Sequence, residues 1–152
     1  MPLAPDLAGR EFPPTPPYDV SRSQIAAFAD AVGADDDVHR DPAAARAAGH
    51  PDVVAPPTFP MVVAFQAMSD FMADPDVGIE LRNVVHSEQR FEIDRPIHAG
   101  DVLTATIGVE TVRQAAGTSL IATRSTVRTV DGERVCVAYA TLAHRAPSGD
   151  DA

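Results

Sequence analysis

One stretch of this 152-residue chain limits what it can fold into more than any other: the segment 60–73, PMVVAFQAMSDFMA. Pro60 is suited to the first position of a helix, and apolar side chains would cover nearly all of that helix. A helix with so little polar surface must be enclosed by the rest of the fold. No apolar run reaches the roughly 18 residues of a membrane span, so we expect the helix inside a folded domain.

The second half of the chain supplies strands that can enclose this helix. In VLTATIGVE, apolar and polar residues alternate, which is typical of an antiparallel strand with one buried face. Residues 118–130 and 134–144 predict two more strands, joined by an Asp-Gly turn that favours a hairpin. The second of these is apolar on both faces, so we expect it inside the sheet. A further strand is predicted in VVHSEQRFEIDRP, with one face carrying His86, Glu88, Arg90, Glu92 and Asp94.

Three shorter features precede the central helix. Residues 1–19 hold six prolines, each of which removes a backbone donor, so we expect an extended arm across the surface. From Ser21, which can cap a helix, apolar residues recur at helical spacing as far as Gly33, which can end it. The segment DPAAARAAG begins with a capping aspartate and predicts a helix of about two turns.

Helices followed by a meander of long antiparallel strands predict an α+β fold. The most economical packing is a hot-dog fold, in which an antiparallel sheet wraps around the central apolar helix. We expect one domain over residues 1–147, including the proline-rich arm, and a polar tail over 148–152. Because one such sheet leaves long edges to be paired, we expect a homodimer or a heterodimer.

Charge and composition narrow the functional classes. A formal net charge of −10 disfavours a nucleic-acid groove or an anionic membrane face, because both need clustered basic side chains. All twelve basic residues are arginine, so no lysine is available for a Schiff base or a P-loop. The lone Cys136 lies in an apolar run and predicts a buried structural thiol. We expect a cytoplasmic protein with no metal and no cofactor, since neither metal-site spacing nor a signal peptide is present.

The loop GADDDVH, residues 33–39, resembles the signature of the MaoC-like or (R)-specific hydratase branch of the hot-dog superfamily. In that family a loop of the form G-D-x-N-P-(I/L)-H precedes a short alanine-rich helix, and an A-H-G segment opens the central helix. Here DPAAARAAG follows the loop, VAPPTFP takes the place of A-H-G, and RFEIDRPIHAGDVL resembles the family's strand and G-D turn. More narrowly, PPTPPY, APPTF, EQRF and YATLA resemble actinobacterial FAS1-like dehydratase domains, which are similar to the HadA and HadC subunits of (3R)-hydroxyacyl-ACP dehydratase.

The resemblance implies reversible hydration of a 2-enoyl thioester, which needs a base, an acid and donors for the thioester oxygen. In the family, an Asp and a His five residues later hold the water, and a backbone N–H at the start of the central helix polarises the carbonyl. His39 matches the histidine, but Ala34 stands where the aspartate is expected. This leaves the neighbouring aspartates as candidates, Asp36 first, with Asp35 and Asp37 in the same loop. Pro57 stands where the family has glycine, and it has no N–H to donate.

These departures predict a chain that keeps the acyl-binding architecture but has largely lost its own catalysis. Losing one oxyanion donor alone costs typically 100-fold to 1,000-fold in rate. We therefore expect the substrate-binding, weakly catalytic or non-catalytic subunit of a (3R)-hydroxyacyl thioester dehydratase in fatty-acid metabolism. Its substrate would be an acyl-CoA or acyl-ACP, and its partner a MaoC-like (HadB-type) catalytic subunit. The residues predicted to bind the acyl chain are Thr58, Phe59, Met61, Phe65, Met68 and Phe71.

Two other functions stay open at this point. In one, the chain is a complete homodimeric (R)-specific enoyl-CoA hydratase that uses His39 with Asp35 or Asp36. In the other, it binds acyl thioesters without catalysis. Structural roles compete with the catalytic ones, since His39 can form a surface ion pair with the neighbouring aspartates, which can also act as solvated charge or helix caps.

Overall fold

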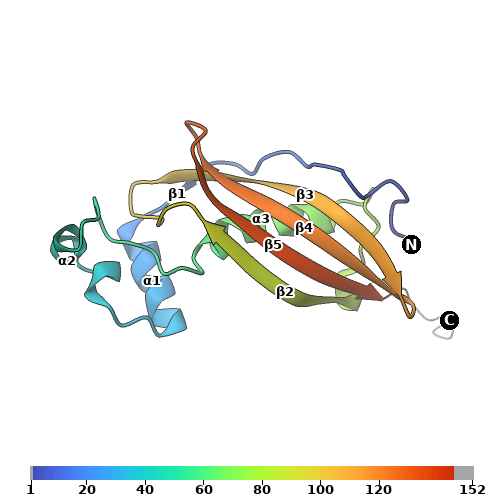
Figure 1. Cartoon of the computed structure of the whole chain (residues 1–152), viewed down its shortest axis with the longest axis horizontal. Helices are drawn as coiled ribbons and strands as arrows, with labels where there is room; N and C mark the ends of the chain where they lie inside the picture. Colours follow the sequence, from blue (N-terminus) through green and yellow to red (C-terminus); the bar gives the residue numbers. More distant parts are fainter. Residues whose placement is uncertain (1, 146–152) are drawn as a thin grey trace.

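A five-stranded antiparallel sheet curls around one long helix in the computed structural model, which describes residues 2–145 (Figure 1). The order of the strands across the sheet is β1-β3-β4-β5-β2. Their bounds are β1 Tyr18–Asp19, β2 Val84–Ile93, β3 Val102–Ala115, β4 Thr118–Thr129 and β5 Arg134–Arg145. This is the predicted hot-dog arrangement, and β5, which is apolar on both faces, lies inside the sheet between β4 and β2. The predicted tail at 148–152 lies outside the described residues.

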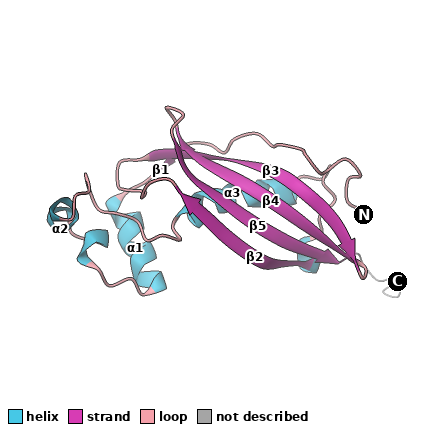
Figure 2. Cartoon of the chain, viewed as in Figure 1, coloured by secondary structure: helices cyan, strands magenta, loops and turns pink. Residues whose placement is uncertain are grey.

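The central helix α3, Pro60–Ala73, lies behind the curled sheet and packs mainly against β3 and β4 (Figure 2). Its buried face carries Pro60, Val63, Ala64, Ala67, Met68 and Phe71. The prediction of an enclosed helix holds for this face only. Phe65 is 50% exposed, and Met61 and Met72 are only partly buried, so one apolar flank of α3 is left uncovered by the sheet of its own chain.

Short helices before α3 begin and end where their capping residues predict. Helix α1, Arg22–Val32, starts after a capping box, in which the Ser21 side chain accepts from the Gln24 N–H and the Gln24 side chain accepts from the Ser21 N–H. It ends at Gly33, which takes the left-handed conformation with φ of 70°. A 3-10 turn, η1 Asp37–His39, then leads into α2, Pro42–Ala47, and a second turn, η2 Leu81–Asn83, leads into β2.

The proline-rich arm covers the outer edge of β3. The Phe12 N–H donates to the Ile107 carbonyl and the Thr15 N–H to the Ala105 carbonyl, both at 2.9 Å. The Thr15 hydroxyl accepts from the Ala105 N–H at 3.0 Å. The arm therefore occupies hydrogen-bonding groups that an edge strand would otherwise offer to another chain.

The opposite edge strand, β2, is unpaired on its outer side within residues 2–145, and a bulge interrupts it. His86 lies opposite Leu142, whereas Glu88 lies opposite Thr141, so one extra residue stands between them on β2. Residues that lie opposite each other on antiparallel strands point to the same face of the sheet, and Leu142 is buried on the inner face. His86 therefore points inward and does not share the outer face with Glu88 and Arg90. The prediction of one face for all five polar residues is wrong at His86, because a bulge reverses the alternation.

Two further expectations are confirmed by the sheet. Asp131 and Gly132 lie in the turn between β4 and β5, and Gly132 has a φ of 97°. Cys136 is buried in β5, and burial raises the pKa of its thiol to about 11.

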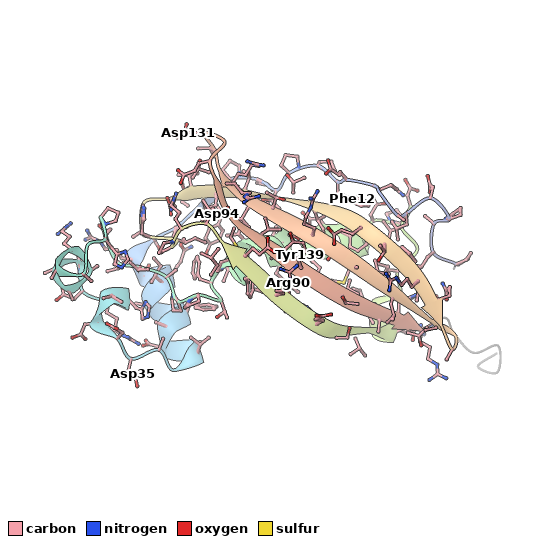
Figure 3. The ribbon with its side chains drawn as sticks, in the orientation of Figure 1. Phe12, Asp35, Arg90, Asp94, Asp131 and Tyr139 are labelled. Carbon is pink, nitrogen blue, oxygen red and sulfur yellow. The ribbon has the colours of Figure 1, made fainter. Side chains whose placement is uncertain are left out.

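On the outer face of the sheet, the Arg90 guanidinium lies 3.9 Å from the centre of the Tyr139 ring (Figure 3).

Candidate functional site

A cavity of about 240 Å³ lies where the loop before α3 meets the end of β2. Most of its wall is apolar and comes from the segment 54–57, from Pro60 and from Ile93, Pro96 and Ile97. Three polar side chains also line it: His39, His50 and Arg95. The cavity is thus lined by the predicted histidine His39, by the first residue of α3 and by the last residue of β2.

His39 is held in one orientation by the backbone of the segment before α3. Its Nδ1 lies 2.6 Å from the Val54 carbonyl oxygen, and because a carbonyl can only accept, Nδ1 carries the proton. In return the Val54 N–H donates to the Val38 carbonyl at 2.9 Å. In neutral His39 this leaves Nε2 as an acceptor, which is the state that a general base or a water-holding group requires.

The three aspartates that precede His39 do not line the cavity. Asp36 caps the turn η1, where its Oδ1 accepts from the Val38 N–H at 3.1 Å. All three side chains are exposed, and Asp35 points outward from the loop (Figure 3). Asp36, the residue predicted to act with His39, therefore serves the local backbone in this conformation.

Arg40 explains why this loop keeps its shape. Its Nη1 donates to the Ala34 carbonyl at 2.7 Å, and its Nη2 donates to Asp30 at 2.6 Å. The guanidinium thus ties the loop to the end of α1 at Ala34, the position for which the sequence resemblance predicts an aspartate. A cation with two fixed acceptors resists the rearrangement that would bring Asp35 or Asp36 to His39.

Arg95 and Asp101 hold the opposite wall of the cavity. Arg95 donates to both carboxylate oxygens of Asp101, at 2.9 and 3.0 Å, and its Nε donates to Glu133. Asp101, which is 7% exposed, also accepts from the His98 N–H at 3.0 Å. Burial acts to raise the pKa of Asp101, but the hydrogen bonds from Arg95 and His98 outweigh it and the pKa is lowered. Asp101 and Glu133 already neutralise the charge of the Arg95 guanidinium. We therefore interpret Arg95 as a residue that stabilises the cavity wall.

The backbone before α3 offers few donors to the cavity. Pro56 and Pro57 line it and carry no N–H, and the Phe59 N–H donates to the Pro56 carbonyl at 2.9 Å. Thr58 is exposed and does not line the cavity. Prolines therefore stand before the N-terminus of α3, where the sequence resemblance predicts an oxyanion donor.

The residues predicted to bind an acyl chain fall into two groups. Phe59, which precedes α3, is 1% exposed and packs between Tyr18 and Phe28, with ring centres 6.5 and 5.3 Å away. Met68 and Phe71 are buried on α3. Met61 and Phe65, by contrast, lie on the uncovered flank of α3.

Sequence reasoning missed His50 and the role of Arg95. His50 directly follows the Gly49 that ends the alanine-rich segment, and nothing in its spacing indicates that it returns to the cavity. Arg95 lies in the strand-turn segment that carried the family resemblance, but its ion pair with Asp101 depends on the turn between them.

Within residues 2–145, no group of three or more His, Cys, Asp or Glu side chains is placed to hold a metal ion. In the same part of the chain, every helix is too short or too polar to cross a bilayer.

Comparison with known proteins places this chain in a family. The family described as FAS1-like, dehydratase domain region has a sequence model that matches residues 6–138. A UPF0336 protein of Saccharopolyspora erythraea is 44% identical over 156 residues, and one of Clavibacter michiganensis subsp. michiganensis is 47% identical over 152 residues. Both alignments cover 100% of this chain and 100% of the relative.

Solved structures agree on the fold. The HadBC (3R-hydroxyacyl-ACP dehydratase) complex of Mycobacterium tuberculosis contains a chain with 34% identity and a TM-score of 0.83, over 93% of this chain and 99% of that one. A MaoC-like dehydratase gives 31% identity and a TM-score of 0.78, over 92% of this chain and 42% of that one. The ChsH1-ChsH2 complex of Mycobacterium tuberculosis gives 19% identity and a TM-score of 0.73, over 92% and 99%, which is a likeness of fold alone.

Proposed function

The chain belongs to the FAS1-like dehydratase domain region family, and on that premise we propose that it is the substrate-binding subunit of a (3R)-hydroxyacyl thioester dehydratase in fatty-acid metabolism. In this proposal it is weakly catalytic or non-catalytic by itself. The observation that carries the proposal is the lining of the cavity, which includes His39 but no carboxylate from residues 2–145. The proline-masked start of α3 supports the same conclusion.

The reaction shows what the cavity lacks. Removing water from a 3-hydroxyacyl thioester requires a base for the Cα proton, an acid for the leaving hydroxyl, and donors for the enolate-like oxygen. His39 Nε2 can serve one proton transfer, but Asp36 faces its own turn and Pro57 cannot donate. A partner chain that carries an Asp–His pair would supply the missing groups.

The open edge of the sheet supports the pairing with such a partner. Within residues 2–145, strand β2 is unpaired on its outer side, and Ile93, an inner-face residue at its end, is 45% exposed. Phe65 adds to this apolar surface from α3. We propose that a MaoC-like catalytic subunit covers it, in keeping with the HadBC and ChsH1-ChsH2 structures, which are both complexes. A homodimer would use the same surface when the partner is missing.

The acyl chain would run from the cavity between α3 and β2. Pro60 begins α3 and Ile93 ends β2, and both line the cavity, so the two elements lead away from it. In this proposal the uncovered flank of α3, with Met61 and Phe65, would form one apolar wall, and the inner-face side chains Phe91 and Ile93 of β2 would form the other. Methionine is suited to a wall that meets chains of different length, because its side chain is flexible and polarisable. We call this space the acyl passage.

One observation favours a second candidate, a self-sufficient hydratase. His39 is oriented by Val54 in the tautomer that a base requires. This function would also need Asp35 or Asp36 to turn toward His39, against the hydrogen bonds that Arg40 makes with the loop.

Hydration of crotonyl-CoA separates the two candidates. We expect the purified chain to show little turnover alone and normal turnover when co-purified with a MaoC-like subunit. In that complex, His39→Ala in this chain should leave most of the activity. Turnover by the chain alone that His39→Ala abolishes would reject the subunit proposal and establish the second candidate.

A further inference from the structure

The backbone at the end of α2 fixes the position of His50 in the cavity wall. Gly49 has a φ of 91°, which turns the chain, and the His50 N–H donates to the Ala45 carbonyl at 3.0 Å. Two residues later the chain is fixed again, because the Asp52 carboxylate accepts from the Arg22 guanidinium at 2.9 and 2.8 Å. His50 therefore lies on a backbone that is held on both sides of it.

The imidazole of His50 is partly buried in this wall and has no hydrogen-bond or ion-pair partner within residues 2–145. The other two polar side chains of the wall are engaged. Arg95 donates to two carboxylates and to a backbone carbonyl, and the Nδ1 of His39 donates to a backbone carbonyl. An imidazole carries at least one N–H in either neutral tautomer and in its charged form. His50 can therefore offer a donor to a molecule in the cavity.

The backbone of the wall supplies few donors that could replace it. Four of the lining residues are prolines, which have no N–H: Pro56, Pro57, Pro60 and Pro96. The N–H groups of Val54 and Ala55 already donate to carbonyls of the chain, at 2.9 and 2.7 Å. A carbonyl group that enters this apolar cavity loses its hydrogen bonds to water, which is costly unless the wall provides a donor.

We propose that His50 binds the carbonyl oxygen of the acyl thioester, in place of the backbone donor that Pro57 cannot provide. The inference rests on the function proposed above, because it names the side chain by which the substrate-binding subunit would hold its ligand. The His50 N–H donates to the thioester oxygen, and the apolar part of the wall contacts the first carbons of the acyl chain. His50 is a substrate-binding residue here, and the proton transfers stay with the partner.

The test compares two ligands that differ only at this carbonyl, butyryl-CoA and its thioether S-butyl-CoA. Neither can be hydrated or dehydrated, so isothermal titration calorimetry measures their binding to the purified chain without turnover. The quantity of interest is the Kd of S-butyl-CoA divided by the Kd of butyryl-CoA. We expect a ratio of about 10 for the wild type, because a buried carbonyl left without its donor loses about tenfold in affinity.

Three variants, each checked for its fold by circular dichroism, assign this preference to one side chain. His50→Leu removes the donor and should lower the ratio about 10-fold. His50→Gln keeps a donor and should stay within about 3-fold of the wild type. His86→Leu changes an exposed histidine that lies outside the cavity, so it is the control and should leave the ratio unchanged.

The outcomes separate this inference from the proposed function. A wild-type ratio near 1, or an unchanged ratio in His50→Leu with both ligands bound, would overturn the role of His50 and leave the subunit proposal intact. An equal loss of affinity for the two ligands would show that His50 contacts another part of CoA, which also overturns the inference. If the wild-type chain bound neither ligand, alone or in complex with a MaoC-like subunit, the proposed function would be rejected and this inference with it.

Discussion

The ion pair between Arg95 and Asp101 determines how firmly the cavity wall is held, and Asp101→Asn tests its contribution. The carboxylate accepts three hydrogen bonds, at 2.9 and 3.0 Å from Arg95 and at 3.0 Å from the His98 N–H. Asparagine keeps the shape but replaces one acceptor oxygen by an NH2 group that faces the guanidinium. Hydrogen bonds to charged groups contribute about 1.5–3 kcal/mol each, and breaking a buried ion pair costs about 3–5 kcal/mol. Arg95 is 26% exposed and keeps Glu133, so we expect a loss near the lower end, about 3 kcal/mol.

Urea denaturation followed by circular dichroism at neutral pH would measure this loss, and the chain offers a matched control. Asp94 accepts the same two-pronged contact from Arg134, at 2.7 and 2.9 Å, but both side chains are on the surface. Asp94→Asn should therefore destabilise the fold far less, because solvent screens the exposed pair. Equal losses in the two variants would refute the argument that burial gives the Arg95–Asp101 pair its strength.

The pH dependence gives the same prediction a second readout. The folded state lowers the pKa of Asp101 below its ordinary value of 3.8, so the folded protein binds this proton less readily than the unfolded chain. The stability from the carboxylate is complete above that ordinary value and is lost as the pH falls through the lowered pKa. The difference between wild type and Asp101→Asn should therefore shrink in strong acid, and a difference that grows there would contradict the assignment.

Two further predictions concern other parts of the fold. Burial lowers the pKa of His144, against an opposing effect of Glu80, and its Nε2 accepts from the Glu80 N–H at 3.2 Å. Stability should therefore fall as the pH drops below the ordinary histidine value of 6.5, and His144→Gln should flatten this dependence in thermal unfolding from about pH 8 to about pH 5. Phe12 anchors the arm by an edge-to-face contact with Phe71, with ring centres 5.1 Å apart, and it is partly buried. Phe12→Ala should cost about 2 kcal/mol in urea denaturation, and a loss near zero would show that the arm is held by its backbone alone.

Local signals in the sequence predicted most of the elements. Ser21 and Gly33 mark the two ends of α1, and Pro42 and Pro60 stand at the first positions of α2 and α3, as the structure confirms. Each of these signals acts within a few residues, through a side-chain cap or a fixed φ angle. The hot-dog arrangement followed because an apolar helix and several alternating strands have few ways to bury each other.

Features that depend on contacts between distant residues were not predictable in the same way. The bulge that turns His86 away from the face of Glu88 is a mismatch between β2 and β5, and neither strand shows it by itself. The same holds for Arg40, whose bond to the Ala34 carbonyl exists only because η1 folds back on the end of α1. His50 likewise reaches the cavity through the path of the chain and not through a motif.

The two edges of the sheet differ, and the difference indicates where the proposed partner would bind relative to the cavity. The arm uses prolines and backbone hydrogen bonds to occupy β3 as far as Val109, so another chain finds that edge taken. In the described part of the chain nothing pairs with the outer side of β2, and its last residue, Ile93, lies in the wall of the cavity that His39 also lines. A chain that pairs with β2 would therefore arrive beside the cavity and the acyl passage together. In the subunit proposal the partner supplies the catalytic groups, and from that side they could reach the cavity without moving the bound thioester.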